Sequence, residues 1–162
     1  MQDLLLRVLR HEEGLRLDPY QDSRGWWTIG YGHLIDRRRG GSLPKWIAPS
    51  FPISQDEADE LLAYDVREAQ IALGNRLPFF PKLDGVRQVV LAAMAFQLGL
   101  GGVLAFRLML AAMERADWRA ARAEMLNSKW ARQTSARAQR MANALATGDA
   151  NFFGLPIAPP GV

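Results

Sequence analysis

The segment between Asp84 and Gly99 constrains the fold most, because it is apolar nearly all round. A helix without a polar face is stable in water only when other elements cover it. Asp84 can cap its first turn, and Gly99 can close its end. The sequence therefore predicts a central buried helix. Its apolar residues are Val86, Val89, Val90, Leu91, Ala93, Met94 and Phe96.

Helical patterns also flank this segment. A first short helix carries Leu5, Val8 and Leu9 on one stripe and should end at Gly14. A capping box at 54–57 opens a second helix, which we expect to end before Gly74. Further helices are expected around 103–114, 117–127 and 135–146.

The stretch from 15 to 35 has a different pattern. A turn-like run at 22–25 is followed by aromatic and β-branched residues, which indicates a β-hairpin. Treated as one strand, this run puts Thr28, Gly30 and Gly32 on one face and Ile29, Tyr31 and His33 on the other. The predicted fold is α+β, mainly α, with a small hairpin lobe, a long connecting helix and a helical C-terminal lobe.

We expect residues 1–162 to form one domain. Its small lobe should span about 12–60, and its C-terminal lobe about 75–150 with the first helix packed on it. Residues 37–52, rich in Gly, Pro, Ser and Arg, should form a surface loop. The proline-rich tail, 155–162, should be loosely held.

Composition excludes several classes of site. The chain has no cysteine, so disulfides, thiolate metal sites and cysteine nucleophiles are absent. Its two histidines lack the spacing of metal ligands, so we expect no metal and no cofactor. We find no signal-peptide pattern and no run of ~20 apolar residues, which predicts accumulation in the cytoplasm.

Charge is unevenly distributed. Residues 1–60 hold 8 Lys/Arg and 10 Asp/Glu, whereas residues 114–140 hold 7 and 3. The basic segment suits a polyanionic partner such as nucleic acid, anionic lipid or cell wall. A solvated, arginine-rich helical surface explains the same composition.

Glu12 and Glu13 break a local rule, because they end the first helix where carboxylates oppose the helix dipole by roughly 0.3–1 kcal/mol each. Such a violation indicates either a functional site or a frayed, solvated helix end. In the hairpin, Thr28 lies beside two glycines, and Asp22 adds a second carboxylate. A β-bulge and a turn-forming Asp22 are the structural alternatives. Together, two carboxylates and a hydroxyl suit glycosidic bond cleavage.

These residues carry a resemblance to a known family. The chain resembles the active-site region of phage-type lysozymes (endolysins), glycoside hydrolase family 24, at four places. These are 13–17 (EGLRL), 20–22 (YQD), Gly25 and 28–33 (TIGYGH). The likeness extends over parts of 56–66, 96–99 and 128–140, but residues 36–52 match poorly and the tail does not match. The resemblance implies the two-lobe lysozyme fold.

The resemblance also implies residue roles. Glu13 would be the general acid, while Asp22 and Thr28 would position the attacking water in an inverting reaction. Gly32, Leu34, Phe96 and Gln97 would line the cleft. Glu13 would pair with Arg137, Glu12 with Arg140, and His33 with Asp65.

The implied function is hydrolysis of the β-1,4 bond between N-acetylmuramic acid and N-acetylglucosamine in bacterial peptidoglycan, for host lysis. The resemblance implies a monomer without a nucleic-acid partner, with a holin as its route from the cytoplasm. Two alternatives stay open: a lytic transglycosylase acting on the same bond, and a non-catalytic basic helical protein that binds cell wall or membrane. Asp22 and Thr28 together favour hydrolysis, because transglycosylases manage with one catalytic acid.

Overall fold

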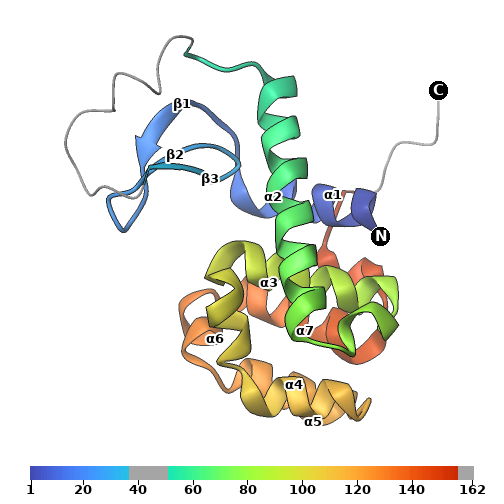
Figure 1. Cartoon of the computed structure of the whole chain (residues 1–162). Coiled ribbons are helices and arrows are strands. Elements are labelled where there is room, and N and C mark those ends of the chain that lie inside the picture. Colours follow the sequence, from blue (N-terminus) through green and yellow to red (C-terminus); the bar gives the residue numbers. More distant parts are fainter. Residues whose placement is uncertain (37–50, 157–162) are drawn as a thin grey trace. The chain divides into compact units, whose positions relative to one another are not determined.

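The computed structural model describes residues 1–36 and 51–156 (Figure 1). Most of the loop expected at 37–52 and of the tail expected at 155–162 therefore lies outside the described residues. The chain divides into two compact units: unit 1 is Met1–Val8 with Ala69–Val162, and unit 2 is Leu9–Glu68. Helices α1 (Gln2–Glu13) and α2 (Gln55–Arg76) each contribute residues to both units.

Unit 2 contains a small antiparallel sheet in the order β1-β2-β3 (Figure 1). The strands are β1 (Arg16–Gln21), β2 (Trp27–Gly30) and β3 (His33–Asp36). The predicted hairpin is therefore present, and a third strand extends it. This confirms an α+β fold in which helices dominate.

The expected single strand through 28–33 was wrong. The chain reverses at Tyr31–Gly32, where the Gly32 N–H donates to the Ile29 carbonyl at 3.3 Å. Gly30 and Gly32 have φ values of 66° and 101°, a backbone region that side chains disfavour. Both glycines therefore serve the reversal, rather than sharing one strand face with Thr28.

Tyr31, at the tip of this reversal, interacts with the parts of α1 and α2 that belong to unit 2. Its side chain is buried and hydrogen-bonds Asp59 of α2. Arg10 of α1 completes the cluster, with its Nε 2.8 Å from Asp59 Oδ1. Burial raises the pKa of Tyr31, and the charge of Asp59 adds to this effect while Arg10 opposes it.

Helix α2 begins at the predicted capping box. The Glu57 N–H donates to Ser54 Oγ at 3.1 Å, and the Ser54 N–H donates to Glu57 Oε2 at 2.7 Å. The helix ends at Arg76 rather than before Gly74. One glycine costs a helix interior only about 1 kcal/mol, whereas Pro78 prevents its continuation.

Unit 1 is built around α3 (Gly85–Leu104). Asp84 caps this helix by accepting from the Arg87 N–H at 3.0 Å, and Gly99 interrupts it with φ 72° and ψ 164°. Residues 89–95 are all buried. With a mean hydropathy of 1.4, α3 is long and apolar enough to cross a membrane by composition, contrary to our expectation. A buried core helix passes the same test, and the burial of 89–95 assigns α3 to the core.

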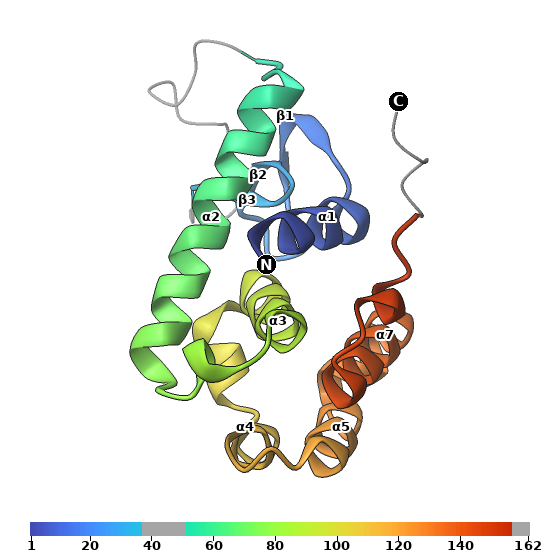
Figure 2. The same cartoon turned by 90° about the vertical axis from the view of Figure 1, so that its right-hand side faces the viewer.

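The remaining helices are short. They are η1 (Phe80–Lys82), α4 (Arg107–Glu114), α5 (Trp118–Leu126), α6 (Lys129–Gln133), α7 (Ser135–Thr147) and η2 (Ala150–Phe153). The helix expected at 103–114 is instead split near Phe106, and α6 was not anticipated because five residues carry little periodicity. Figure 2 shows α5 and α7 side by side. Buried Phe153 extends the core beyond 150.

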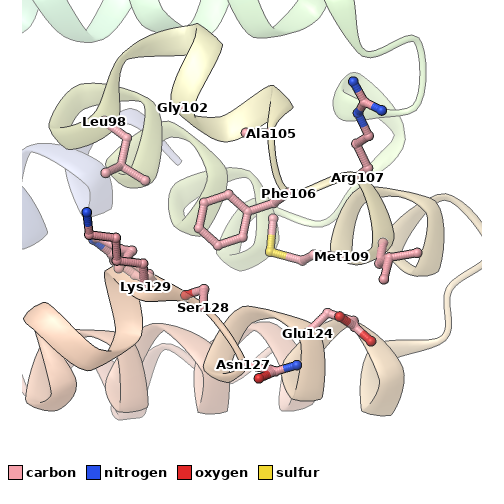
Figure 3. Close-up of a pocket in the computed structure, with 12 residues that line it drawn as sticks. Leu98, Gly102, Ala105, Phe106, Arg107, Met109, Glu124, Asn127, Ser128 and Lys129 are labelled. Carbon is pink, nitrogen blue, oxygen red and sulfur yellow. The ribbon is translucent and has the colours of Figure 1, made fainter.

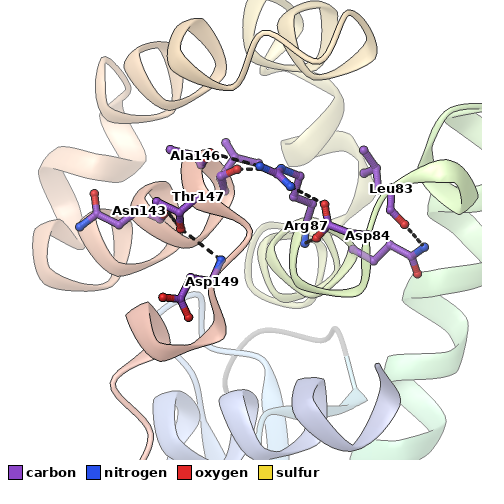
Figure 4. Close-up of polar contacts among 9 residues, drawn as sticks. Leu83, Asp84, Arg87, Asn143, Ala146, Thr147 and Asp149 are labelled. Atoms are coloured by element: carbon purple, nitrogen blue, oxygen red, sulfur yellow. Dashed lines mark hydrogen bonds and ion pairs between the residues drawn. The ribbon is translucent and has the colours of Figure 1, made fainter.

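Arg87 is a charged residue inside this core, only 9% exposed. Its Nε donates to the Leu145 carbonyl at 2.9 Å and its Nη2 to the Ala146 carbonyl at 3.1 Å, so it caps the end of α7 (Figure 4). Its Nη1 pairs with Asp84, and the Trp118 ring lies 3.9 Å from its guanidinium carbon. One side chain thus joins α3, α5 and α7.

Replacing Arg87 should destabilise the protein more than any surface arginine. Arg87→Met removes every donor and leaves two carbonyls unpartnered, so we expect a loss of about 2–4 kcal/mol in the free energy of unfolding. Arg107→Met is the matched control, since Arg107 is exposed on α4; it should stay within about 0.5 kcal/mol. Urea unfolding measures both, and equal effects would contradict the capping role.

Tyr31 should make stability depend on alkaline pH. Its folded-state pKa lies above 10.0, so its contribution is complete below pH 10.0 and is lost as pH rises through the folded value. We expect the wild-type protein to lose more stability between pH 9.5 and 11.5, as a rough window, than Tyr31→Phe does. Urea midpoints across this range provide the measurement, and parallel curves would contradict the assignment.

Candidate active site

The three predicted catalytic residues all belong to unit 2 and come from three segments. Glu13 is the last residue of α1, and Gly14 follows it with φ 69°. Asp22 directly follows β1, and Thr28 lies within β2. A helix end and a hairpin thus supply the two carboxylates from different elements, as expected from the sequence.

Asp22 builds the turn between β1 and β2. Its Oδ1 accepts from the Arg24 N–H at 2.8 Å and from the Trp26 N–H at 2.9 Å. The Asp22 N–H donates to the Trp26 carbonyl, and Gly25 supplies the φ of 79° that the turn requires. The turn-forming alternative is therefore correct. It does not exclude chemistry, because no described group hydrogen-bonds Oδ2.

Thr28 is tied to the same turn. Its Oγ1 donates to the Trp26 carbonyl at 3.1 Å, and the residue is only 4% exposed. The backbone of Trp26 therefore connects both groups: its N–H donates to Asp22 and its carbonyl accepts from Thr28. Because the Thr28 proton is used, its oxygen is left as an acceptor.

Strand register places Tyr20, Thr28 and Leu34 in one row. Tyr20 pairs with Thr28 across β1 and β2, and Thr28 pairs with Leu34 across β2 and β3. Directly paired residues point to the same face of a sheet. Tyr20 was not among the residues expected to act. Counting outward from the turn at 22–25 pairs Tyr20 with Thr28, and this signal could have found it.

Electrostatics link Tyr20 to both carboxylates. Burial raises the pKa of Tyr20; Arg16 opposes this, and the charges of Glu13 and Asp22 raise it further. Both acids therefore contribute to the electrostatic environment of one phenol. The Arg16 guanidinium carbon lies 4.4 Å from the centre of the Tyr20 ring.

His33 and Asp65 form the expected pair within unit 2. The His33 Nδ1 lies 3.0 and 2.9 Å from the two carboxylate oxygens of Asp65 in α2. About a quarter of each side chain is exposed. This contact attaches β3 to α2 and orients the imidazole ring.

The other predicted site residues belong to unit 1. Phe96 and Gln97 lie on α3, and Arg137 lies on α7. Gln97 is held in place because its Oε1 accepts from Trp130 Nε1 at 3.0 Å. The proposed pairs of Glu13 with Arg137 and of Glu12 with Arg140 join residues of different units and stay predictions.

Unit 1 also contains a pocket of about 360 Å³ (Figure 3). Leu98, Phe106, Met109 and Trp130 give it an apolar lining, and the ring of Trp130 meets that of Phe106 edge-on at 6.2 Å. The polar lining residues include Glu124, Asn127, Ser128 and Lys129. The pocket therefore suits an amphipathic group carrying charges of both signs.

Within residues 1–36 and 51–156, no three or more His, Asp or Glu side chains form a group that could hold a metal ion. The groups that unit 2 does bring together are a carboxyl at a helix end, a turn-held carboxylate and a buried hydroxyl. This set can transfer protons and orient a water molecule without a cofactor.

Comparison with known proteins agrees with this chemistry. A family model described as phage lysozyme matches residues 10–146. The "Pre-baseplate central spike protein Gp5" of Enterobacteria phage T4 is 33% identical over 171 residues, which cover 96% of this chain but 30% of that protein. The "Probable T4-type lysozyme 1" of Dictyostelium discoideum is 30% identical over 162 residues, covering 90% of this chain and 95% of that protein.

A shorter match is the "Endolysin" of Salmonella phage P22, 33% identical over 93 residues that cover 56% of this chain and 58% of that protein. The family model, in contrast, spans most of the chain. The chain therefore belongs to the phage lysozyme family and is a glycoside hydrolase of the lysozyme type.

Proposed function

We propose that this lysozyme hydrolyses the β-1,4 bond between N-acetylmuramic acid and N-acetylglucosamine in bacterial peptidoglycan, with inversion at the anomeric carbon. One observation carries the proposal: the backbone of Trp26 holds Asp22 and Thr28 in a single hydrogen-bonded unit. This unit offers two acceptors to one water molecule, namely Asp22 Oδ2 and Thr28 Oγ1.

The water would donate one proton to each acceptor, which directs its lone pair at the anomeric carbon. As the new carbon–oxygen bond forms, the glycosidic bond breaks. Glu13 gives its proton to the leaving oxygen, and Asp22 receives the proton that the water releases. A water between carboxylate and sugar needs carboxyl groups ~6.5–9.5 Å apart, the separation typical of inverting enzymes.

Other residues would bind the glycan or support the acid. We assign Leu34 to glycan binding because it shares the face of Thr28, and the turn residue Gly32 because it lies next to β3. Phe96 and Gln97 would contribute from α3. The supporting residues would be Arg137, which partners Glu13, and the pair of His33 with Asp65.

The biological setting that we propose is lysis of a bacterial host by a monomeric endolysin released through a holin. Two similar proteins carry the name endolysin. Another similar protein is named a pre-baseplate central spike protein, of which this chain covers 30%.

Product analysis tests the reaction. Purified peptidoglycan digested by the wild-type protein should yield new reducing ends, and NMR of the fresh product should show inverted anomeric configuration. A lytic transglycosylase would instead form an anhydro product without consuming water. Retained configuration would contradict the water-positioning role of Asp22 and Thr28.

Glu13→Gln tests the acid itself. The variant keeps the size of the side chain but has no donatable proton, so turnover should fall by about 10²–10⁴-fold, the usual range for general acid catalysis. Glu12→Gln is the matched control, as it changes the neighbouring carboxyl, and it should retain most activity. A Glu13→Gln protein with near wild-type turnover would contradict the assignment of Glu13 as the acid.

Two variants of Asp22 separate structure from chemistry. Asn keeps the Oδ1 acceptor for Arg24 and Trp26, so Asp22→Asn should fold with nearly wild-type stability while losing about 10²-fold or more in turnover. Asp22→Ala loses both turn bonds as well and should unfold about 1–2 kcal/mol more easily than Asp22→Asn. Thermal unfolding and turnover on purified cell walls measure the two effects. Full activity in Asp22→Asn would show that only the turn matters.

A further inference from the structure

We propose that Tyr20 is a further substrate-positioning residue, whose hydroxyl donates a hydrogen bond to an oxygen of the glycan bound on the face it shares with Thr28 and Leu34. The proposal rests on the glycan-cleaving function above. It adds a donor from β1 to the proposed site groups of unit 2, which come from the end of α1, the turn after β1, β2 and the segment around β3.

The register of the sheet supports this position. Tyr20 and Thr28 are direct cross-strand partners, as are Thr28 and Leu34. A glycan that contacts Thr28 and Leu34 therefore runs along the row that Tyr20 continues. Tyr20 and Arg16 also line a pocket of about 380 Å³ along β1.

The hydroxyl of Tyr20 is available to a ligand. Residues 1–36 and 51–156 provide it with no hydrogen-bond partner, although the residue is partly buried. Partly buried tyrosine hydroxyls usually find a partner. A saccharide, which presents hydroxyl and acetamido oxygens, supplies the acceptors that the protein does not.

The surroundings of Tyr20 keep its phenol protonated, so that it can donate a hydrogen bond. Burial raises its pKa, Arg16 opposes this, and the charges of Glu13 and Asp22 raise it further, so the proton is held at neutral pH. Arg16 lies over the ring at 4.4 Å and occupies one of its faces. The hydroxyl edge, rather than that face, is therefore the part that a sugar can reach.

Tyr20→Phe tests the role of the hydroxyl. Because the substitution removes an oxygen without a protein partner, the melting temperature should stay within about 2 °C of wild type. The value of kcat/KM on soluble glycan strands should fall about 3- to 10-fold, mainly through KM, as expected for the loss of one neutral hydrogen bond made in both ground and transition state. Tyr64→Phe is the control, because Tyr64 is an exposed tyrosine on α2.

Direct observation of the phenol gives a second readout, independent of turnover. The chain has three tyrosines, so ¹³Cζ-tyrosine spectra can be assigned with three Tyr→Phe variants. Adding soluble glycan strands to the Glu13→Gln protein should shift the Tyr20 resonance and leave that of Tyr64 unchanged. Absence of a Tyr20 shift at saturating glycan would overturn the proposal.

The two measurements also separate this proposal from the function on which it rests. If Glu13→Gln abolishes turnover while Tyr20→Phe keeps kcat/KM within twofold of wild type, the Tyr20 proposal is wrong and the proposed function stands. If Glu13→Gln leaves turnover unchanged, the assignment of the acid fails whatever Tyr20 does. A loss of turnover in Tyr20→Phe together with a large drop in melting temperature would assign Tyr20 a structural role and reject the proposal.

Discussion

Helix α3 is stable in water only because unit 1 covers it, and this burial governs how that unit is arranged. The segment from 89 to 95 has no side chain that water would solvate well, so its burial is the main hydrophobic gain of the unit. Such a core accepts a charge only when hydrogen-bond partners compensate it. Arg87 has these partners in Asp84 and in the carbonyls of Leu145 and Ala146 near the end of α7, and its guanidinium lies against Trp118. The same packing explains why position 148 is a glycine, since a Cβ there would lie 2.8 Å from Arg87 Nη1.

In unit 2 a single turn combines structure and chemistry. One carboxylate oxygen of Asp22 accepts from the backbone N–H groups of Arg24 and Trp26, which fixes the position of the other oxygen. The hydroxyl of Thr28 donates to the Trp26 carbonyl, which fixes the position of its oxygen in the same way. A group held by its own backbone contacts loses little entropy when a ligand arrives, which is the advantage of a preorganised site. The turn-forming and functional interpretations of Asp22 are therefore compatible.

Much of this site could be predicted from local sequence, because its contacts are local. The hairpin, the turn at Asp22, the helix end at Glu13 and the capping box at Ser54 each depend on residues a few positions apart. Errors arose where chain direction changed without a strong signal. The reversal at Tyr31 was not predicted, because Gly30 and Gly32 also fit the alternation of a strand in sequence, although both have positive φ in the structure. Tyr20 was overlooked because its importance comes from pairing with Thr28, eight positions away, and not from its own neighbours.

The sequence by itself determined the helical core, the caps, the hairpin and the family, since periodicity, capping residues and motif spacing are properties of the chain. The tertiary structure decided which distant groups meet. Whereas the pair of Asp65 with His33 was implied by the family resemblance, Asp59 reaches Arg10 across 49 positions and Arg87 reaches the end of α7 across 58. These partners cannot be deduced from spacing, because burial leaves each polar group in need of one while only packing selects which residue supplies it.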